Sequence, residues 1–224
     1  MFKIKHFIRQ SWLLIISSFC FGLLIAIANA AWSPRIEQNK IDKLNCLMGG
    51  LLTKAESFEH TAELEIESAR GKKIKSNIYK ALSDRGRCVG WAFNASGPGF
   101  ADQIELVIAV DKDFQKIAGF DCLASNETPG FGDRIKLPYY RSQFVAAPAG
   151  KLTLVKTGDT EKIDSEIVVI SGATVSSEAV VKIINNSLTQ IKDQMQNKGL
   201  IVSSGNQDIR GAPAKRGPKS EAWE

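Results

Sequence analysis

The chain has 224 residues, of which 44% are hydrophobic, and a formal net charge of +5. This length supports one globular domain with appendages and is too short for a second full domain. The basic residues are dispersed and concentrate only at the two ends, without an interleaved aromatic patch, which argues against a nucleic-acid-binding protein.

A stretch without charged residues lies near the N-terminus. It covers residues 11–31, and Lys3, Lys5 and Arg9 precede it. A helix needs about 20 apolar residues to cross a bilayer, so this stretch is predicted to be a transmembrane anchor. Because positive charge stays on the cytoplasmic side, residues 1–10 are predicted to be a cytoplasmic leader, with the main domain on the other side of the membrane.

A cleavable signal peptide is the competing interpretation of the same stretch. Ala28-Asn29-Ala30 followed by Ala31 fits a small-residue cleavage site behind a cationic start. The apolar stretch is longer than the usual signal-peptide core of about 7–15 residues, which favours a retained anchor. Both interpretations export the domain.

The region after the anchor has a helical pattern. Apolar residues at Ile36, Ile41, Leu44 and Met48 predict a juxtamembrane helix over residues 32–58. A globular domain is expected over residues 59–200. Its first part, from Ala62 to Gly71, is rich in glutamate and has no structural assignment from the sequence.

Successive strands at hairpin spacing are predicted next. Strands are expected at 74–82, 88–93, 104–110 and 116–123, with a turn at 94–99. This spacing favours an antiparallel sheet over repeated βαβ units. The predicted fold class is therefore α+β, an antiparallel sheet with packed helices, preceded by one N-terminal transmembrane helix.

Further elements are predicted towards the C-terminus. A short helix is expected at 139–144, strands at 152–155 and 167–170, and a helix from Val175 onward. The apolar stripe of this last helix indicates packing on the core: it consists of Val180, Ile184, Leu188, Ile191 and Met195. Residues 201–224 are polar and rich in Gly, Pro and Lys, and are predicted to be a disordered tail.

The turn before the last helix has a composition that suits an anion. A helix N-terminus presents unpaired N–H groups and a partial positive charge, which together favour a phosphate. The same residue types are common as N-caps and turn residues, so a purely structural role stays open. The small and hydroxyl-bearing residues gathered there are Ser171, Gly172, Ala173, Thr174, Ser176 and Ser177.

A second loop is predicted to have a defined shape. Pro129 fixes its own φ and restricts Thr128, while Gly130 and Gly132 permit positive φ. Many tight loops share this composition. The full loop comprises Glu127, Thr128, Pro129, Gly130, Phe131 and Gly132.

These two strings resemble motifs of one known family. Ser-Gly-Ala-Thr-x-Ser-Ser at 171–177 is similar to the flavinylation motif of the FMN-binding domain in the G subunit of Rnf electron-transport complexes. Glu-Thr-Pro-Gly-Phe-Gly at 127–132 is similar to that family's Glu-Thr-Pro-Gly-Leu-Gly loop. The C subunit of the sodium-pumping NADH:quinone reductase shares the domain. The anchor and its Ser-Pro-Arg-Ile exit match as well, so the resemblance covers most of the chain.

The resemblance implies roles for the residues of both strings. Thr174 would carry FMN through a phosphoester bond made by a separate flavin transferase, which suits the weak nucleophilicity of an unactivated hydroxyl. The neighbouring residues 171–177 would surround the phosphate, and loop 127–132 would lie against the isoalloxazine ring, with Glu127 and Thr128 hydrogen-bonded to its polar edges. Where the family motif often has an acidic residue, this chain has Val168 or Val169, which leaves recognition by the transferase open.

The resemblance also implies a function. The chain is expected to be a single-pass protein of the inner membrane, with residues 59–200 as a periplasmic FMN-binding domain. It would pass electrons within an Rnf-type complex that couples ferredoxin and NAD to ion translocation, with other membrane subunits as partners and no turnover alone. Alternatives are a C-type subunit of a quinone reductase, a stand-alone envelope flavin carrier, or a non-redox anion-binding or scaffold module. No catalytic triad, P-loop or metal-ligand spacing is found in the sequence.

Overall fold

The computed structural model describes residues 2–68, 71 and 73–201, with the backbone alone for residues 2–10. The predicted disordered tail, apart from its first residue, lies outside the described residues. The chain divides into two compact units, residues 1–50 and 51–224, and each unit is described by itself.

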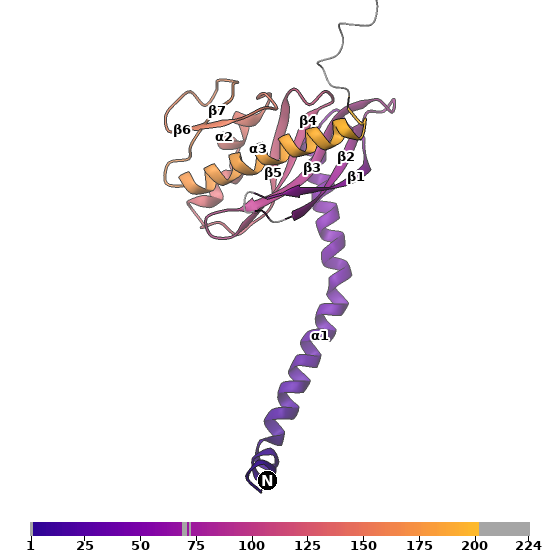
Figure 1. Cartoon of the computed structure of the whole chain (residues 1–224), viewed down its shortest axis with the longest axis vertical. Coiled ribbons are helices and arrows are strands. Elements are labelled where there is room, and N and C mark those ends of the chain that lie inside the picture. Colours follow the sequence, from indigo (N-terminus) through magenta and orange to yellow (C-terminus); the bar gives the residue numbers. More distant parts are fainter. Residues whose placement is uncertain (1, 69–70, 72, 202–224) are drawn as a thin grey trace, which may run out of the picture. The chain divides into compact units, whose positions relative to one another are not determined.

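The first unit consists of one long helix, α1, at Phe2–Leu51 (Figure 1). It contains a stretch long and apolar enough to cross a membrane, by length and composition. The expected anchor and juxtamembrane helix are therefore one continuous helix, with Pro34 inside it. The helix ends at Leu51, before the expected residue 58. A turn follows, in which Ala55 N–H donates to Leu52 O at 2.9 Å, and the first strand begins at Ser57.

The second unit is built on a five-stranded antiparallel sheet, as predicted. The strands lie in chain order across the sheet, β1-β2-β3-β4-β5. Each therefore pairs with its neighbour in sequence, which is the arrangement that hairpin spacing predicts. The strands are β1 at Ser57–Glu67, β2 at Lys73–Leu82, β3 at Cys88–Pro98, β4 at Gln103–Asp111 and β5 at Ile117–Ser125.

The turn predicted at 94–99 is wrong. Strand β3 continues to Pro98, and its last five residues pair with Gln103–Val107 of β4. The chain reverses just afterwards, where Gly99 N–H bonds to Asp102 O at 2.8 Å. Asn94 and Ser96 have a local preference for turns, but the pairing with β4 outweighs it.

The glutamate-rich segment without assignment forms most of β1. Leu64 and Ile66 are buried, while the glutamates between and around them face outward. Glu63 pairs with Lys75 of β2 at 2.7 Å. The alternation of apolar and charged residues is the period-two signal of a half-buried strand, and it is readable in the sequence.

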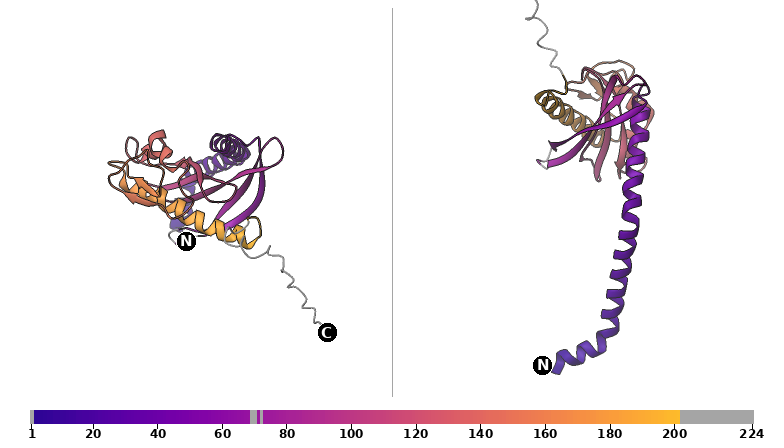
Figure 2. Two further views of the ribbon diagram at one scale, coloured as in Figure 1. Left: turned by 90° about the horizontal axis from the view of Figure 1, so that it is seen from above. Right: turned by 90° about the vertical axis from the view of Figure 1, so that its right-hand side faces the viewer.

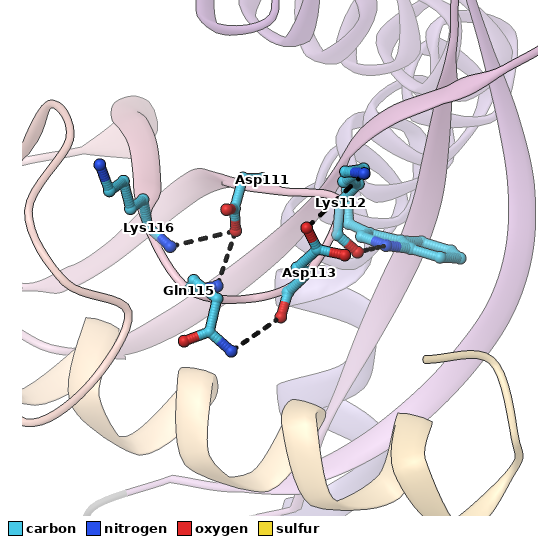
Figure 3. A network of polar contacts seen from close by, with 6 residues as sticks. Asp111, Lys112, Asp113, Gln115 and Lys116 are labelled. Carbon is cyan, nitrogen blue, oxygen red and sulfur yellow. Dashed lines mark hydrogen bonds and ion pairs between the residues drawn. The ribbon is translucent and has the colours of Figure 1, made fainter. Parts of the chain in front are cut away.

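The carboxylate of Asp111 stabilises the turn between β4 and β5 (Figure 3). Oδ1 of Asp111 accepts hydrogen bonds from Gln115 N–H at 2.7 Å and from Lys116 N–H at 3.0 Å. Lys112 O in the same turn accepts a hydrogen bond from Trp91 Nε1 at 3.2 Å. These bonds tie the expected turn after residue 110 to the neighbouring strand β3.

The remainder of the domain contains short elements and one long helix. Strands β6 and β7 pair in parallel, apart from the main sheet. The short helix expected at 139–144 is present as α2 followed directly by η2. The elements are η1 at Gly132–Lys136, α2 at Pro138–Arg141, η2 at Ser142–Phe144, β6 at Thr153–Val155, β7 at Glu166–Val168 and α3 at Thr174–Asn197.

Helix α3 runs across one face of the sheet (Figures 1 and 2). It contacts β1, β3 and β4, and its predicted apolar stripe from Val180 to Met195 is buried there. Residues of the sheet such as Phe93 and Ile108 complete this core. The packing fixes the position of the helix N-terminus, which is the end that carries the predicted anion-binding turn.

Candidate functional site

The two predicted strings meet at one cavity of about 390 Å³. This volume falls in the range of about 300–1,000 Å³ that is usual for small-molecule sites. The walls come from three segments far apart in sequence: the turn after β3, the loop after β5 and the N-terminus of α3. The lining residues are Phe100, Thr128, Phe131, Gly132, Gly172, Ala173, Thr174, Val175 and Ser176.

Thr174 is the first residue of α3, and its side chain is exposed on the cavity. The N-cap position before it is Ala173, which has no side chain able to bond the helix N–H groups. The first turn of the helix also contains no acidic residue. The helix N-terminus is thus open to an external anion, and the Thr174 hydroxyl lies at that end.

The turn that leads into the helix is tight. Ala173 N–H bonds to Ile170 O at 2.9 Å. Gly172 has a φ of +83°, in the region that strains other residues. A side chain at this position would approach the Phe131 ring, since an added Cβ would lie 3.5 Å from its Cδ1. This distance is an ordinary van der Waals contact, so the positive φ, and not a lack of space, is what favours glycine at this position.

Ser177 fastens the turn from inside the protein. Its buried hydroxyl donates to Ala173 O at 2.9 Å and accepts from Ile170 N–H at 3.1 Å. Its carbonyl accepts a hydrogen bond from the Tyr140 hydroxyl at 3.2 Å. Burial raises the pKa of Tyr140 well above its ordinary value, so the phenol stays neutral. Ser177 was expected among the residues around the phosphate, and the structure places it behind them.

The loop after β5 has the defined shape that its composition predicts. Thr128 O accepts hydrogen bonds from Phe131 N–H at 3.2 Å and from Asp133 N–H at 3.3 Å. Gly130 has a φ of +77°. The side chain of Thr128 is exposed and the residue lines the cavity, whereas exposed Pro129 and Gly130 are not among the lining residues.

Glu127 points into the protein. Only 4% of the residue is exposed. One carboxylate oxygen accepts from Phe100 N–H at 2.9 Å and Ala101 N–H at 3.1 Å, and the other accepts from Ser176 Oγ at 2.5 Å. The expectation that Glu127 hydrogen-bonds a flavin ring therefore differs from its observed position, since both oxygens are engaged behind the cavity wall.

Three exposed apolar side chains surround the cavity. Phe100 is 67% exposed, Phe131 58% and Val175 51%. Exposed apolar groups that gather around a cavity are typical of ligand or partner contacts. Sequence reasoning missed Phe100, because its position after the last residue of β3 depends on where that strand ends. The predicted turn at 94–99 ended the strand too early, and Phe100 then had no expected place.

A metal centre is not supported in the part of the chain that the structure describes. Among those residues, no group of three or more His, Cys, Asp or Glu side chains is placed to hold an ion. The residues around the cavity are instead hydroxyls, glycines and apolar side chains, which suit an organic phosphate compound better than a cation.

Comparisons with known proteins place the chain in a family. A family model described as an FMN-binding domain matches residues 99–189, a range that includes both strings and Phe100. The chain is 30% identical over 182 residues to the G subunit of the ion-translocating oxidoreductase complex of Shewanella baltica, covering 75% of this chain and 81% of the relative. The chain belongs to the family of these G subunits. Its relationship to the Rnf family, expected from the motifs, is thereby confirmed.

Two further matches extend this comparison. The chain is 29% identical over 178 residues to the G subunit of a proton-translocating ferredoxin:NAD(+) oxidoreductase complex of Clostridium ljungdahlii, covering 80% of this chain and 88% of the relative. The crystal structure of the C subunit of a Na(+)-translocating NADH-quinone reductase from Parabacteroides distasonis matches with a TM-score of 0.50 at 18% identity. That match covers 70% of this chain and 95% of the other, and it concerns the fold alone.

Proposed function

We propose that this chain is the membrane-anchored flavoprotein of an Rnf-type complex, and that its FMN is esterified to Oγ1 of Thr174. The observation that carries the proposal is the exposed Thr174 at an open helix N-terminus, on a cavity bordered by Phe100 and Phe131. A flavin phosphate suits the helix end, and an aromatic ring system suits the exposed rings.

The attachment step needs an outside enzyme. A phosphoester bond forms between Thr174 Oγ1 and the flavin phosphate of a flavin dinucleotide, the phosphoanhydride bond of that dinucleotide breaks, and the nucleoside monophosphate leaves while the hydroxyl proton passes to solvent. A flavin transferase supplies the phosphate in this activated form, because an unactivated threonine hydroxyl is a weak nucleophile. The nearby hydroxyls of Ser176 and Ser177 are already engaged, since they donate to Glu127 and Ala173. The exposure of Thr174 leaves its hydroxyl accessible to that enzyme.

The protein's own residues bind and orient the cofactor. The N–H groups of the first turn of α3 face the phosphate end of the site. Phe100 and Phe131 provide apolar faces for the ring. When bound, FMN accepts electrons from one redox centre and passes them to another, which is chemistry that the side chains present do not perform.

The family and the apolar helix support a proposal for the setting of the site. Relatives are named as subunits of complexes that couple ferredoxin and NAD to ion translocation. We extend to this chain the partnership with other membrane subunits, turnover only within the complex, and a periplasmic position for the domain. The basic residues before the apolar stretch support that orientation. On the exported face, a covalent bond prevents loss of a cofactor that is made in the cytoplasm.

Mass spectrometry of the full chain tests the proposal. The chain is expressed with a flavin transferase, purified in detergent, and measured intact and after peptide mapping. We expect an increment of one FMN less water on the peptide containing Thr174, and none in Thr174→Val. Thr160→Val is the matched control, because Thr160 is an exposed threonine that does not line the cavity and its loss should leave the increment unchanged. Ser171→Ala tests the neighbouring exposed hydroxyl of the turn.

Other outcomes would contradict the proposal in different ways. An increment that persists in Thr174→Val but disappears in Ser171→Ala would move the attachment site to Ser171. A wild-type chain without attached or tightly bound flavin would favour the anion-binding or scaffold alternative.

A further inference from the structure

We propose that Glu127 is a positioning residue for the flavin: its carboxylate joins the turn of Phe100 to the first turn of α3 and so sets the width of the cavity, without contacting the flavin itself. This inference rests on the proposed function, because the width of the cavity matters only if a flavin attached to Thr174 occupies it.

The carboxylate connects three segments that are distant in sequence. Its bonds to the Phe100 and Ala101 amides reach the turn between β3 and β4, and its bond to Ser176 reaches α3 across 49 residues. Glu127 itself belongs to the loop that includes Phe131. Hydrogen bonds to an ionised acceptor are shorter and stronger than neutral ones. One side chain therefore holds all three walls of the cavity.

The surroundings of the carboxylate leave no room for a ligand. Gly132 lies so near that an added Cβ would be 2.6 Å from Oε2 of Glu127 and 2.7 Å from Oγ of Ser176. Gly99 approaches the other oxygen in the same way. With 4% of Glu127 exposed, the residue acts from behind the wall, not at the surface of the cavity.

The hydrogen bonds of Glu127 fix the distance between Phe100 and Thr174. The backbone of Phe100 is bonded to the carboxylate directly, and Ser176 follows Thr174 by two residues in the same helical turn. Removal of the carboxylate frees the Phe100 turn from α3 and leaves the buried Ser176 hydroxyl without its acceptor. The aromatic side of the cavity is then no longer held at a fixed distance from the attachment point.

The variants separate geometry from charge. Glu127→Gln keeps a carbonyl oxygen for the two amides and an amide group opposite Ser176, but has no charge. Glu127→Ala removes every bond. Ser176→Ala removes the hydrogen bond between Glu127 and α3 and leaves the hydrogen bonds between Glu127 and the Phe100 turn. Glu178→Gln is the matched control, because this exposed glutamate near the same helix end pairs with Lys182 and not with the cavity segments.

The first readout needs no flavin. Hydrogen exchange of the Phe100 and Ala101 amides is measured in the full chain carrying Thr174→Val. We expect exchange to be about tenfold faster or more in Glu127→Ala and near the reference rate in Glu127→Gln, Ser176→Ala and Glu178→Gln. Far-ultraviolet circular dichroism checks that each variant is folded.

The second readout reports the attached flavin. Visible circular dichroism of the flavin is measured for chains whose FMN increment is confirmed by mass. A ring held in one orientation gives an induced signal that a freely rotating ring lacks. We expect the signal to fall by at least half in Glu127→Ala, to fall partly in Ser176→Ala, and to persist in Glu127→Gln and Glu178→Gln.

Two results would overturn the inference. One is a Glu127→Ala chain, or a Ser176→Ala chain should the first not fold, with unchanged flavin dichroism. The other is a Glu127→Gln chain with slow amide exchange but a lost flavin signal, which would show that the charge acts on the flavin directly. Neither result touches the proposed function, which fails if the wild-type chain acquires no FMN or if its FMN is attached at a residue other than Thr174.

Discussion

Gln190 of α3 hydrogen-bonds both backbone groups of Glu67 in the edge strand β1. Its Oε1 accepts from Glu67 N–H at 2.7 Å, and its Nε2 donates to Glu67 O at 2.8 Å. Gln194 reaches the carbonyl of Glu65 in the same way, at 2.8 Å. Side-chain amides of the helix thus replace the neighbouring strand that β1 lacks on this side, and they protect an edge that would otherwise be open to another chain.

We expect Gln190→Leu to destabilise the domain modestly. Two hydrogen bonds to an exposed strand end are together worth about 1–2 kcal/mol, which corresponds to roughly 2–8 °C in the melting temperature of a chain of this size. Thermal unfolding of the full chain in detergent measures the shift. Asn197→Leu, at the exposed last residue of α3, is the control. An equal shift in both variants would mean that the Glu67 contact adds nothing.

Gly172→Val should weaken both the fold and flavin attachment. A β-branched residue at a φ of +83° costs about 1–2 kcal/mol, and its Cβ would lie in contact with the Phe131 ring. The melting temperature and the fraction of chains with the FMN increment are measured together. Gly150→Val, in a loop where an added Cβ meets nothing within 4 Å, serves as the comparison. Full attachment in Gly172→Val would show that the turn tolerates distortion.

Ile184→Ala should cost about 2–5 kcal/mol, because this side chain is fully buried between α3 and the sheet. The predicted result is a large fall in melting temperature. Lys182→Ala on the exposed side of the same helix should change it little. A small effect of Ile184→Ala would mean that the helix is held mainly by its polar contacts with β1.

We expect the raised pKa of Tyr140 to cause a loss of stability at alkaline pH. Burial raises its folded pKa above the ordinary value of about 10, so above pH 10 the unfolded chain releases this proton while the folded chain keeps it. The contribution is complete below pH 10 and is lost as pH rises, by up to about 1.4 kcal/mol per pH unit. Tyr140→Phe should remove this part of the slope, although it also loses the bond to Ser177.

Unfolding from pH 8 to 11 in wild type, Tyr140→Phe and Tyr139→Phe measures this effect. Tyr139 is the control because its side chain is half exposed. A slope in Tyr140→Phe equal to that of wild type would contradict the assignment.

The orientation of the chain is testable by labelling. A cysteine placed at exposed Glu161 should react with a membrane-impermeant thiol reagent applied to spheroplasts, in a background where Cys46 is replaced by serine. Labelling should be as fast before lysis as after it. Protection until lysis would place the domain in the cytoplasm and contradict the periplasmic assignment.

Several features of this chain are predictable from local sequence pattern. The length of the apolar stretch predicts the anchor, hairpin spacing predicts the sheet, and the spacing of Val180 and Ile184 predicts the buried face of α3. The strings at 127–132 and 171–177 are sufficient to indicate the family. These features are predictable because each depends on the pattern of apolar and turn residues within a short stretch of sequence.

The polar groups that face the cavity are not predictable in this way, because they depend on contacts between distant segments. Glu127 and Ser177 belong to the two strings, yet their oxygens are engaged behind the wall, whereas Phe100 belongs to neither string and lines the site. The partners of the Glu127 carboxylate lie 26 to 49 residues away in sequence. The sequence shows that a carboxylate or hydroxyl is present at a position. The direction in which that side chain points depends on which distant segments pack against it, and those contacts form only when the whole domain folds.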